Sequence, residues 1–186
     1  QGTGAGTSGQ FHNFLYLPTV AADGRIWLSH NLGADYTNSN NANFNPGQKP
    51  TSTTDFRAYG SLFQWGRLND GHELINWTSG SAGTIVNGTT TTLSATNVPA
   101  SRAFIINTST SNFDWRSTKN DNLWQGVLGV NNPCPQGFRL PTSTEFNALI
   151  AAENITNYET ALISNLNFAQ TMFGGSAGSL ISANGR

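Results

Sequence analysis

The stretch PCPQGFRLPTSTEF, residues 133–146, is the part of the chain that most restricts what it can fold into. Pro133 and Pro135 fix the backbone on either side of a single residue, which leaves little conformational freedom there. Leu140 precedes Pro141 and is therefore pushed towards an extended conformation rather than a helix. We expect a rigid corner in the backbone here, placed directly before a new element.

A helix is predicted to begin just after this corner. Thr142 and Glu145 have the spacing of a capping box, in which each side chain accepts a hydrogen bond from a backbone amide at the helix start. Phe146, Leu149 and Ile150 then recur with the spacing of one helix face. This pattern predicts an apolar stripe that packs against the core, with Phe146 pointing inwards.

Short extended runs bounded by turn residues predict antiparallel strands. Residues 14–28 indicate a hairpin around Asp23–Gly24, and residues 84–93 indicate a second one around Asn87–Gly88, a pair of residues that favours type I′ turns. A further short strand is expected over 103–106, where apolar and β-branched residues predominate.

Two regions between these strands carry weaker signals. Residues 33–54 are rich in Asn, Thr, Ser, Pro and Gly and predict a long loop. Residues 56–68 place several aromatic residues near helical spacing, although two glycines interrupt them. A second capping box, formed by Thr156 and Glu159, predicts a shorter helix near the end of the chain.

The composition argues against several classes of function. Charged residues make up 10% of the 186 residues and the net charge is −1, whereas binding to nucleic acid or anionic membranes needs clustered Lys and Arg. No apolar run of about 18 residues or more occurs, so no membrane span is expected. The polarity comes from Asn, Thr, Ser and 20 Gly, which is typical of loop-rich extracellular proteins.

Three blocks of sequence carry a family resemblance. They are DGRIWLSHNLGA (23–34), AYGSLFQWGRLNDGHE (58–73) and CPQGFRLPTSTEF (134–146). Together they resemble the Fibrobacter succinogenes major paralogous domain, a bacterial secreted domain related to C-type-lectin-like and formylglycine-generating-enzyme-like folds. The blocks have the family's order and approximate spacing, so the resemblance covers most of residues 14–150.

The resemblance implies an α+β, C-type-lectin-like fold with twisted antiparallel strands, two short helices and long loops. Residues that fall in the blocks are expected to be structural: Trp27, Trp65, Arg67, Cys134, Arg139, Pro141, Thr142 and Glu145. Residues 1–12 are expected to form a flexible linker or a mature N-terminus, and residues 13–186 the lectin-like domain.

The chain departs from the family pattern in two places. Phe146 stands where the family usually carries Trp. The family also continues past a Gly-Ser-Leu segment, like residues 178–180 here, into closing strands. We therefore expect the domain to lack its C-terminal strands, which would leave a sheet edge open to strand donation by another chain.

Cys134 is the only cysteine, so no disulfide can form within the chain. A reactive thiol needs a nearby cation or a helix N-terminus, and Arg139 and Thr142 are close in sequence. The preferred interpretation is a small buried group in a rigid loop, or half of a disulfide with an absent segment. The formylglycine-generating relatives need paired cysteines, so the resemblance does not carry that activity to this chain.

Asp70, His72 and Glu73 place two carboxylates and an imidazole within a few residues of one another. Their oxygens could help to bind Ca²⁺, and the histidine could adapt the site to Zn²⁺. The preferred interpretation is a polar turn made by Asp70 and Gly71, because a hard cation needs more ligands than this segment provides.

The tryptophans divide into two expected groups. Trp27 and Trp65 lie in the family blocks and are expected to be buried. Trp77 and Trp115 lie in polar segments and are the candidates for exposed ligand-binding rings. The arginines Arg25, Arg67 and Arg139 are each expected to connect loops through carbonyl or carboxylate groups.

These observations favour a non-enzymatic binding or adhesion domain of a secreted or surface-attached bacterial protein, which recognises a glycan or a protein through its loops. The candidate ligand-binding residues are Trp77, Trp115, Asp70, His72 and Glu73. A structural subunit of a larger extracellular assembly, such as a filament, secretion complex or phage particle, is the alternative. An enzyme of the formylglycine-generating type is a less favoured alternative, which rests on the family resemblance alone. No cofactor is expected beyond a weak case for Ca²⁺.

Overall fold

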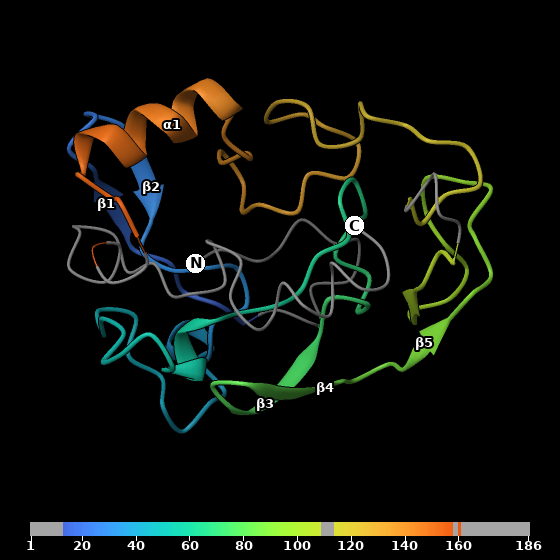
Figure 1. Ribbon diagram of the computed structural model, residues 1–186, viewed down its shortest axis with the longest axis horizontal. Helices are drawn as coiled ribbons and strands as arrows, with labels where there is room; N and C mark the ends of the chain where they lie inside the picture. The colour runs from blue at the N-terminus through green and yellow to red at the C-terminus, as the bar shows by residue number, and fades with distance from the viewer. Residues whose placement is uncertain (1–12, 109–113, 158–159, 161–186) are drawn as a thin grey trace.

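The computed structural model describes residues 13–108, 114–157 and 160, which form an α+β arrangement of short sheets and one α-helix (Figure 1). The α+β class predicted from the sequence is confirmed at this level. In chain order the elements are β1 (Pro18–Val20), β2 (Ile26–Leu28), η1 (Asp35–Thr37), η2 (Phe56–Ala58), β3 (Ile75–Ser79), β4 (Ala82–Ile85), β5 (Thr89–Thr90), β6 (Phe104–Ile105) and α1 (Ser143–Ala152).

The hairpin predicted around Asp23–Gly24 is confirmed. β1 and β2 pair antiparallel, with Thr19 opposite Trp27. Gly24 adopts a φ of +79° in the turn, a conformation that residues with a side chain rarely adopt. The Asp23 carboxylate accepts a hydrogen bond from the backbone amide of Arg25 at 3.0 Å, which holds the turn.

The helix predicted after residue 142 is also confirmed and lies over the β1–β2 hairpin (Figure 1). Thr142 accepts from the amide of Glu145 at 3.2 Å, and the Glu145 carboxylate accepts from the amide of Thr142 at 2.8 Å. Leu149 is fully buried and contacts Ala21 of the hairpin, while Phe146 packs half-buried beside it. The shorter helix predicted from Thr156 and Glu159 falls largely outside the described residues.

The helical spacing over 56–68 gives no α-helix. Only η2 forms, and the chain then runs irregularly through Gly60 and Gly66, which have φ values of +79° and +80°. A Cβ at Gly60 would lie 2.4 Å from the carbonyl oxygen of Leu32, so the backbones approach too closely for any other residue. The long loop at 33–54 is largely as predicted, with η1 as its one short 3₁₀ turn.

The hairpin predicted around Asn87–Gly88 is wrong. β4 pairs antiparallel with β3, which precedes it, and Ile85 lies opposite Ile75. The Asn87 side chain donates to the carbonyl of Gly71 at 2.8 Å, so the Asn-Gly step makes a corner rather than a chain reversal.

After this corner β5 pairs with β6 in parallel, which confirms a short strand within 103–106. The parallel pair departs from the antiparallel arrangement expected from the sequence. The buried side chains form separate clusters rather than one layer between two sheets. Ile105 of β6 packs with Trp115 and Leu123, and Tyr36 packs with Ala58 and Tyr59 around η1 and η2. Within the described part of the chain, no helix has the length and apolar character needed to cross a membrane.

Candidate functional site

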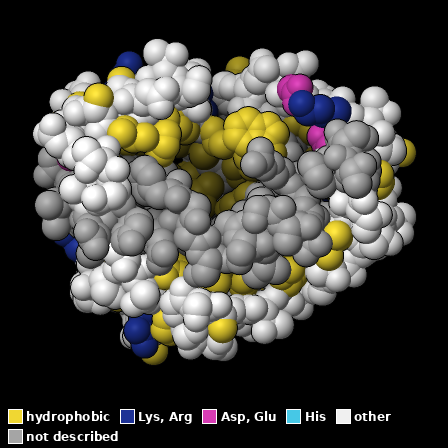
Figure 2. All heavy atoms as spheres, viewed as in Figure 1, with side chains coloured by type: hydrophobic (Ala, Val, Ile, Leu, Met, Phe, Trp, Pro, Cys, Tyr) yellow, Lys and Arg dark blue, Asp and Glu magenta, His cyan; other side chains and the backbone are white. Residues whose placement is uncertain are grey.

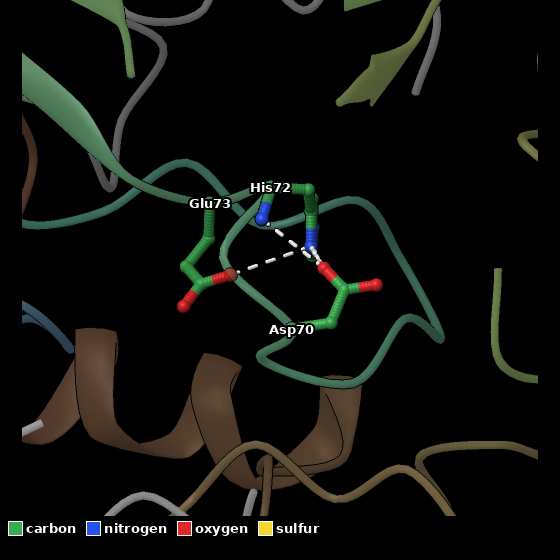
Figure 3. A group of neighbouring side chains, drawn as sticks. All are labelled: Asp70, His72 and Glu73. Atoms are coloured by element: carbon green, nitrogen blue, oxygen red, sulfur yellow. Dashed lines mark hydrogen bonds and ion pairs between the residues drawn. The ribbon is translucent and has the colours of Figure 1, made fainter. Parts of the chain in front are cut away.

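The turn that joins residues 69–73 brings Asp70, His72 and Glu73 together, as the sequence predicted from their spacing (Figure 3). One potential ligand atom from each residue lies within 4.8 Å of the others. Gly71, with a φ of +106°, makes the turn tight enough for the side chains to converge. His72 and Glu73 are buried, at 1% and 0% exposed, and Asp70 is partly exposed.

Both ring nitrogens of His72 are already engaged in hydrogen bonds. The backbone amide of Gln64 donates to Nε2 at 3.0 Å, and Nδ1 lies 2.8 Å from Oδ1 of Asp70. Since an amide can only donate, Nε2 is the accepting nitrogen and the proton of the neutral ring sits on Nδ1. Burial lowers the pKa of His72 below its ordinary value, which keeps the imidazole neutral near pH 7.

The two carboxylates are engaged in the same way. Asp70 accepts from the guanidinium Nε of Arg67 at 2.9 Å and from the amide of His72 at 3.1 Å. Burial raises the pKa of Asp70, but the hydrogen bond with the His72 ring, the charge of Arg67 and the bond from the His72 amide outweigh it and hold that pKa below its ordinary value. Oε2 of Glu73 accepts from the amide of Gly71 at 2.9 Å.

These contacts do not fit a metal centre. A cation bound to His72 would have to displace either the Gln64 amide or the bond to Asp70. Calcium takes about six to eight oxygen ligands, far more than two hydrogen-bonded carboxylates provide. The arrangement instead satisfies backbone amides inside a tight turn, in line with the polar-turn interpretation.

Arg67 connects this turn to a distant part of the chain. Its side chain is fully buried, and its terminal nitrogens donate to the carbonyls of Ala103 at 2.9 Å and Ser101 at 2.7 Å, and to Oε1 of Gln64 at 2.8 Å. The guanidinium carbon lies 5.9 Å from the centre of the Trp115 ring. Arg67 therefore connects loops through carbonyl and carboxylate groups, as the sequence predicted.

Gln64 is a site residue that sequence reasoning missed. Its side-chain oxygen accepts from the amide of Ile105 at 3.0 Å, and its side-chain nitrogen donates to the carbonyl of Ile105 at 2.8 Å. One amide side chain thus takes the place of a strand neighbour for β6. The available signal was a neutral polar residue between two aromatics, Phe63 and Trp65.

Side chains from later in the sequence satisfy the backbone carbonyls of residues 65–67. The three bonds run from Trp115 Nε1 to Trp65 O (2.8 Å), from Asn131 Nδ2 to Gly66 O (2.9 Å) and from Trp124 Nε1 to Arg67 O (3.1 Å). Irregular backbone can be buried only if its polar groups find partners, and these side chains supply them.

We call the bonded group formed by Gln64, Arg67, Asp70, His72 and Glu73 the buried polar network.

Neither tryptophan proposed as a ligand contact is well exposed. Trp115 is 1% exposed and packs in the core, so its expected exposure is wrong. Trp77 is half-buried, packs edge-on against Tyr59 at 5.2 Å between ring centres, and donates to the carbonyl of Gly60 at 2.8 Å. Both indoles fill structural positions although their sequence neighbours are polar.

Trp65 shows the opposite deviation, because it was expected in the core and is 55% exposed. Its ring centre lies 5.0 Å from that of Trp124, which is itself buried. Trp27 is half-buried and packs against the cluster around Leu149. Trp65 therefore replaces Trp77 and Trp115 as the exposed aromatic of interest.

Cys134 is a buried free thiol in the rigid corner, 7% exposed. Burial raises the pKa of Cys134 to about 12, so the thiolate needed for nucleophilic chemistry is scarce at neutral pH. The arginine in the same block pairs elsewhere: Arg139 binds the Glu145 carboxylate with two nitrogens, at 2.8 and 2.7 Å. Those bonds lower the pKa of Glu145 to about 2.

Comparison of the chain with protein-family models, with curated proteins and with solved structures found no match.

Proposed function

We propose that this protein is a non-catalytic binding domain with a C-type-lectin-like fold, belonging to a secreted or surface-attached bacterial protein, and that it recognises a glycan or another protein. The three sequence blocks that resemble the Fibrobacter succinogenes major paralogous domain support the fold and the extracellular setting. The observation that carries the binding function is the exposed ring of Trp65.

Trp65 has the features of a rigid contact residue. More than half of the residue is exposed, its backbone oxygen is held by Trp115, and its ring rests beside Trp124. An aromatic ring fixed in this way loses little conformational entropy on binding, which is why Trp is enriched at binding sites for proteins. Its flat face also suits the apolar face of a sugar.

The chemistry of the other candidate residues supports a non-enzymatic function. Asp70, His72 and Glu73 direct their polar atoms at backbone amides and at Arg67. Cys134 is buried with a raised pKa. Figure 2 shows a face on which, among the described residues, charged side chains are sparse and hydrophobic side chains gather near the centre.

A second candidate function is that of a subunit in an extracellular assembly. The loop that carries Val127, Leu128 and Val130 is markedly apolar at its surface, with exposed fractions of 46%, 95% and 71%. Exposed aliphatic residues grouped on one loop are typical of surfaces that contact another protein. Mass photometry of the purified protein that gives only a monomer over a wide concentration range would count against this candidate.

Glycan and protein arrays test the proposed binding function. We expect at least one reproducible ligand for the wild-type protein, and a loss of about tenfold or more in affinity for Trp65→Ala, as for aromatic residues at the centre of an interface. Phe44→Ala is the matched control, because Phe44 is also an exposed aromatic, at 38%, on another loop. Arrays without any ligand, or equal losses in both variants, would contradict the proposal.

A further inference from the structure

A groove lies in the loop that joins β5 to β6. Its volume is about 410 Å³, within the range usual for small-molecule sites. Ten described residues from both ends and the middle of the loop line it, among them Thr90, Thr92, Leu93, Ala100, Ser101 and Ile105. None of these ten is charged.

The floor of the groove is rigid. Ile105 is 2% exposed and packs with Trp115, and Leu93 lies half-buried against the same cluster. The amide of Ser94 donates to the carbonyl of Trp115 at 3.0 Å, and the amide of Ser117 donates to the carbonyl of Ser94 at 2.9 Å. The apolar floor is thus fixed to the core before any ligand arrives.

Hydroxyl groups border this floor. Oγ1 of Thr90 accepts from the amide of Thr92 at 3.2 Å, and Oγ of Ser101 accepts from the amide of Ala103 at 3.1 Å. In both cases the hydroxyl proton is left to donate elsewhere. Within the described part of the chain, the hydroxyl of Thr92 has no hydrogen-bond partner.

We infer that this groove is a binding site for a neutral saccharide. A sugar ring presents an apolar C–H face and a rim of hydroxyls that both donate and accept, which matches a floor of Leu93 and Ile105 bordered by Thr90, Thr92 and Ser101. An ionic ligand would lose its hydration without gaining a counter-charge. This inference rests on the proposed binding function and names the class of ligand.

A peptide fits the groove less well. Extended peptides bind largely through main-chain hydrogen bonds to a strand edge. Here the amides of Thr92, Ser94 and Thr96 already donate to Thr90 Oγ1, to the Trp115 carbonyl and to Ser94 Oγ. These three amides are therefore not available to pair with a peptide, whereas the hydroxyls of Thr90, Thr92 and Ser101 can donate to a ligand.

The experiment is a titration of the purified protein with neutral saccharides: glucose, galactose, mannose, N-acetylglucosamine and their β-linked disaccharides. Glucuronic acid serves as the charged counterpart. Binding is followed by amide NMR shifts and by tryptophan fluorescence, since Trp115 lies beneath the floor. We expect at least one neutral sugar to bind and to shift the resonances of residues 90–105, with glucuronic acid binding weaker.

Matched variants locate the site. Thr92→Val removes one hydroxyl without changing the volume, and we expect a loss in affinity of about five- to tenfold, the usual effect of one hydrogen bond. Ala100→Trp places a bulky ring at the groove and should abolish binding. Thr91→Val is the control: Thr91 is exposed, adjacent in sequence and absent from the lining. Thermal melts of each variant verify folding, and Thr92→Val keeps the test decisive if Ala100→Trp does not fold.

The outcomes separate this inference from the proposed function. Sugar binding that is lost in Thr92→Val and kept in Thr91→Val supports the inference. Sugar binding that is kept in Thr92→Val and Ala100→Trp but lost in Trp65→Ala overturns the inference and leaves the proposed function standing. The inference is likewise overturned, and the proposed function kept, if no neutral sugar binds while the arrays identify a protein or peptide ligand. If neither the titration nor the arrays identify any ligand, both the inference and the proposed function are overturned.

Discussion

Replacing Arg67 with Met tests whether the buried polar network holds the irregular loops together. Removal of one partner from a buried ion pair costs about 3–5 kcal/mol, and the Asp70 side chain is only 14% exposed. The carbonyls of Ala103 and Ser101 also lose a donor, although Ser101 is exposed and water can replace the bond there. We therefore expect a loss of about 4 kcal/mol in the free energy of unfolding.

Such a loss is large against the total stability of about 5–15 kcal/mol for a typical domain. Urea unfolding followed by circular dichroism and tryptophan fluorescence measures it. Lys119→Met is the matched control, since Lys119 pairs with Asp121 at 3.0 Å in an ion pair whose side chains are 61% and 62% exposed. Exposed pairs contribute about 0–1 kcal/mol, so the control should unfold near the wild-type midpoint.

A double-mutant cycle identifies the source of the effect. If the pairing with Asp70 dominates, then Asp70→Asn should cost less in the Arg67→Met background than in the wild type, with a coupling of about 1–3 kcal/mol. If Arg67→Met proves too unstable to measure, Arg67→Lys keeps a charge and provides a milder substitution for the same cycle. A loss for Arg67→Met no larger than that of Lys119→Met would refute the reasoning.

Two further predictions concern titratable groups. His30 is 3% exposed, and its Nε2 lies 2.7 Å from the carbonyl oxygen of Gln48. Burial lowers the pKa of His72 and of His30 below 6.5, so the unfolded chain binds protons near pH 6.5 that the folded chain does not. The stability that is present above that pH is therefore lost as the pH falls. The urea midpoint should be lower at about pH 5.5 than at about pH 7.5, and His30→Gln should show a weaker dependence; equal midpoints in the wild type would contradict this. Burial raises the pKa of Cys134 to about 12. A thiol reagent should therefore modify the native protein far more slowly than the urea-unfolded protein. Comparable rates would show that Cys134 is not a buried, protonated thiol in the native protein.

Local sequence signals predicted the elements whose bonds are local. The Asp23–Gly24 turn joins strands that are adjacent in the chain, and the capping box of Thr142 and Glu145 closes within one helical turn. The Asn87–Gly88 step carries an equally strong hairpin signal, yet β4 pairs with β3 and the Asn87 side chain bonds to the carbonyl of Gly71. β3 and Gly71 lie outside the few residues that a turn signal describes, so the signal could not take their bonds into account.

The candidate site divides in the same way. The proximity of Asp70, His72 and Glu73 was predictable because the three residues lie on one turn. Their function was not, since it depends on Gln64 and Arg67, whose partners Ser101, Ala103 and Ile105 lie some distance along the chain.

The tryptophans show why exposure was harder to predict than proximity. Polar neighbours around Trp115 favoured an exposed ring, but in a fold with little regular structure the neighbours in space decide burial. Trp115 packs against Ile105, and its ring nitrogen donates to the carbonyl of Trp65. Trp65 lies in an otherwise buried segment, and its ring projects out beside Trp124.

Hydrogen bonds connect the buried polar network to the groove. Arg67 donates to the carbonyl of Ser101, and Gln64 bonds to both backbone groups of Ile105. Ser101 and Ile105 both line the groove. Polar groups that resemble a catalytic or metal site thus fix the backbone beneath a surface that itself carries no charge. A change at Arg67 should consequently loosen the groove as well as the fold. Thr92→Val should weaken saccharide binding without lowering the urea midpoint, because the Thr92 hydroxyl makes no hydrogen bond to another described residue.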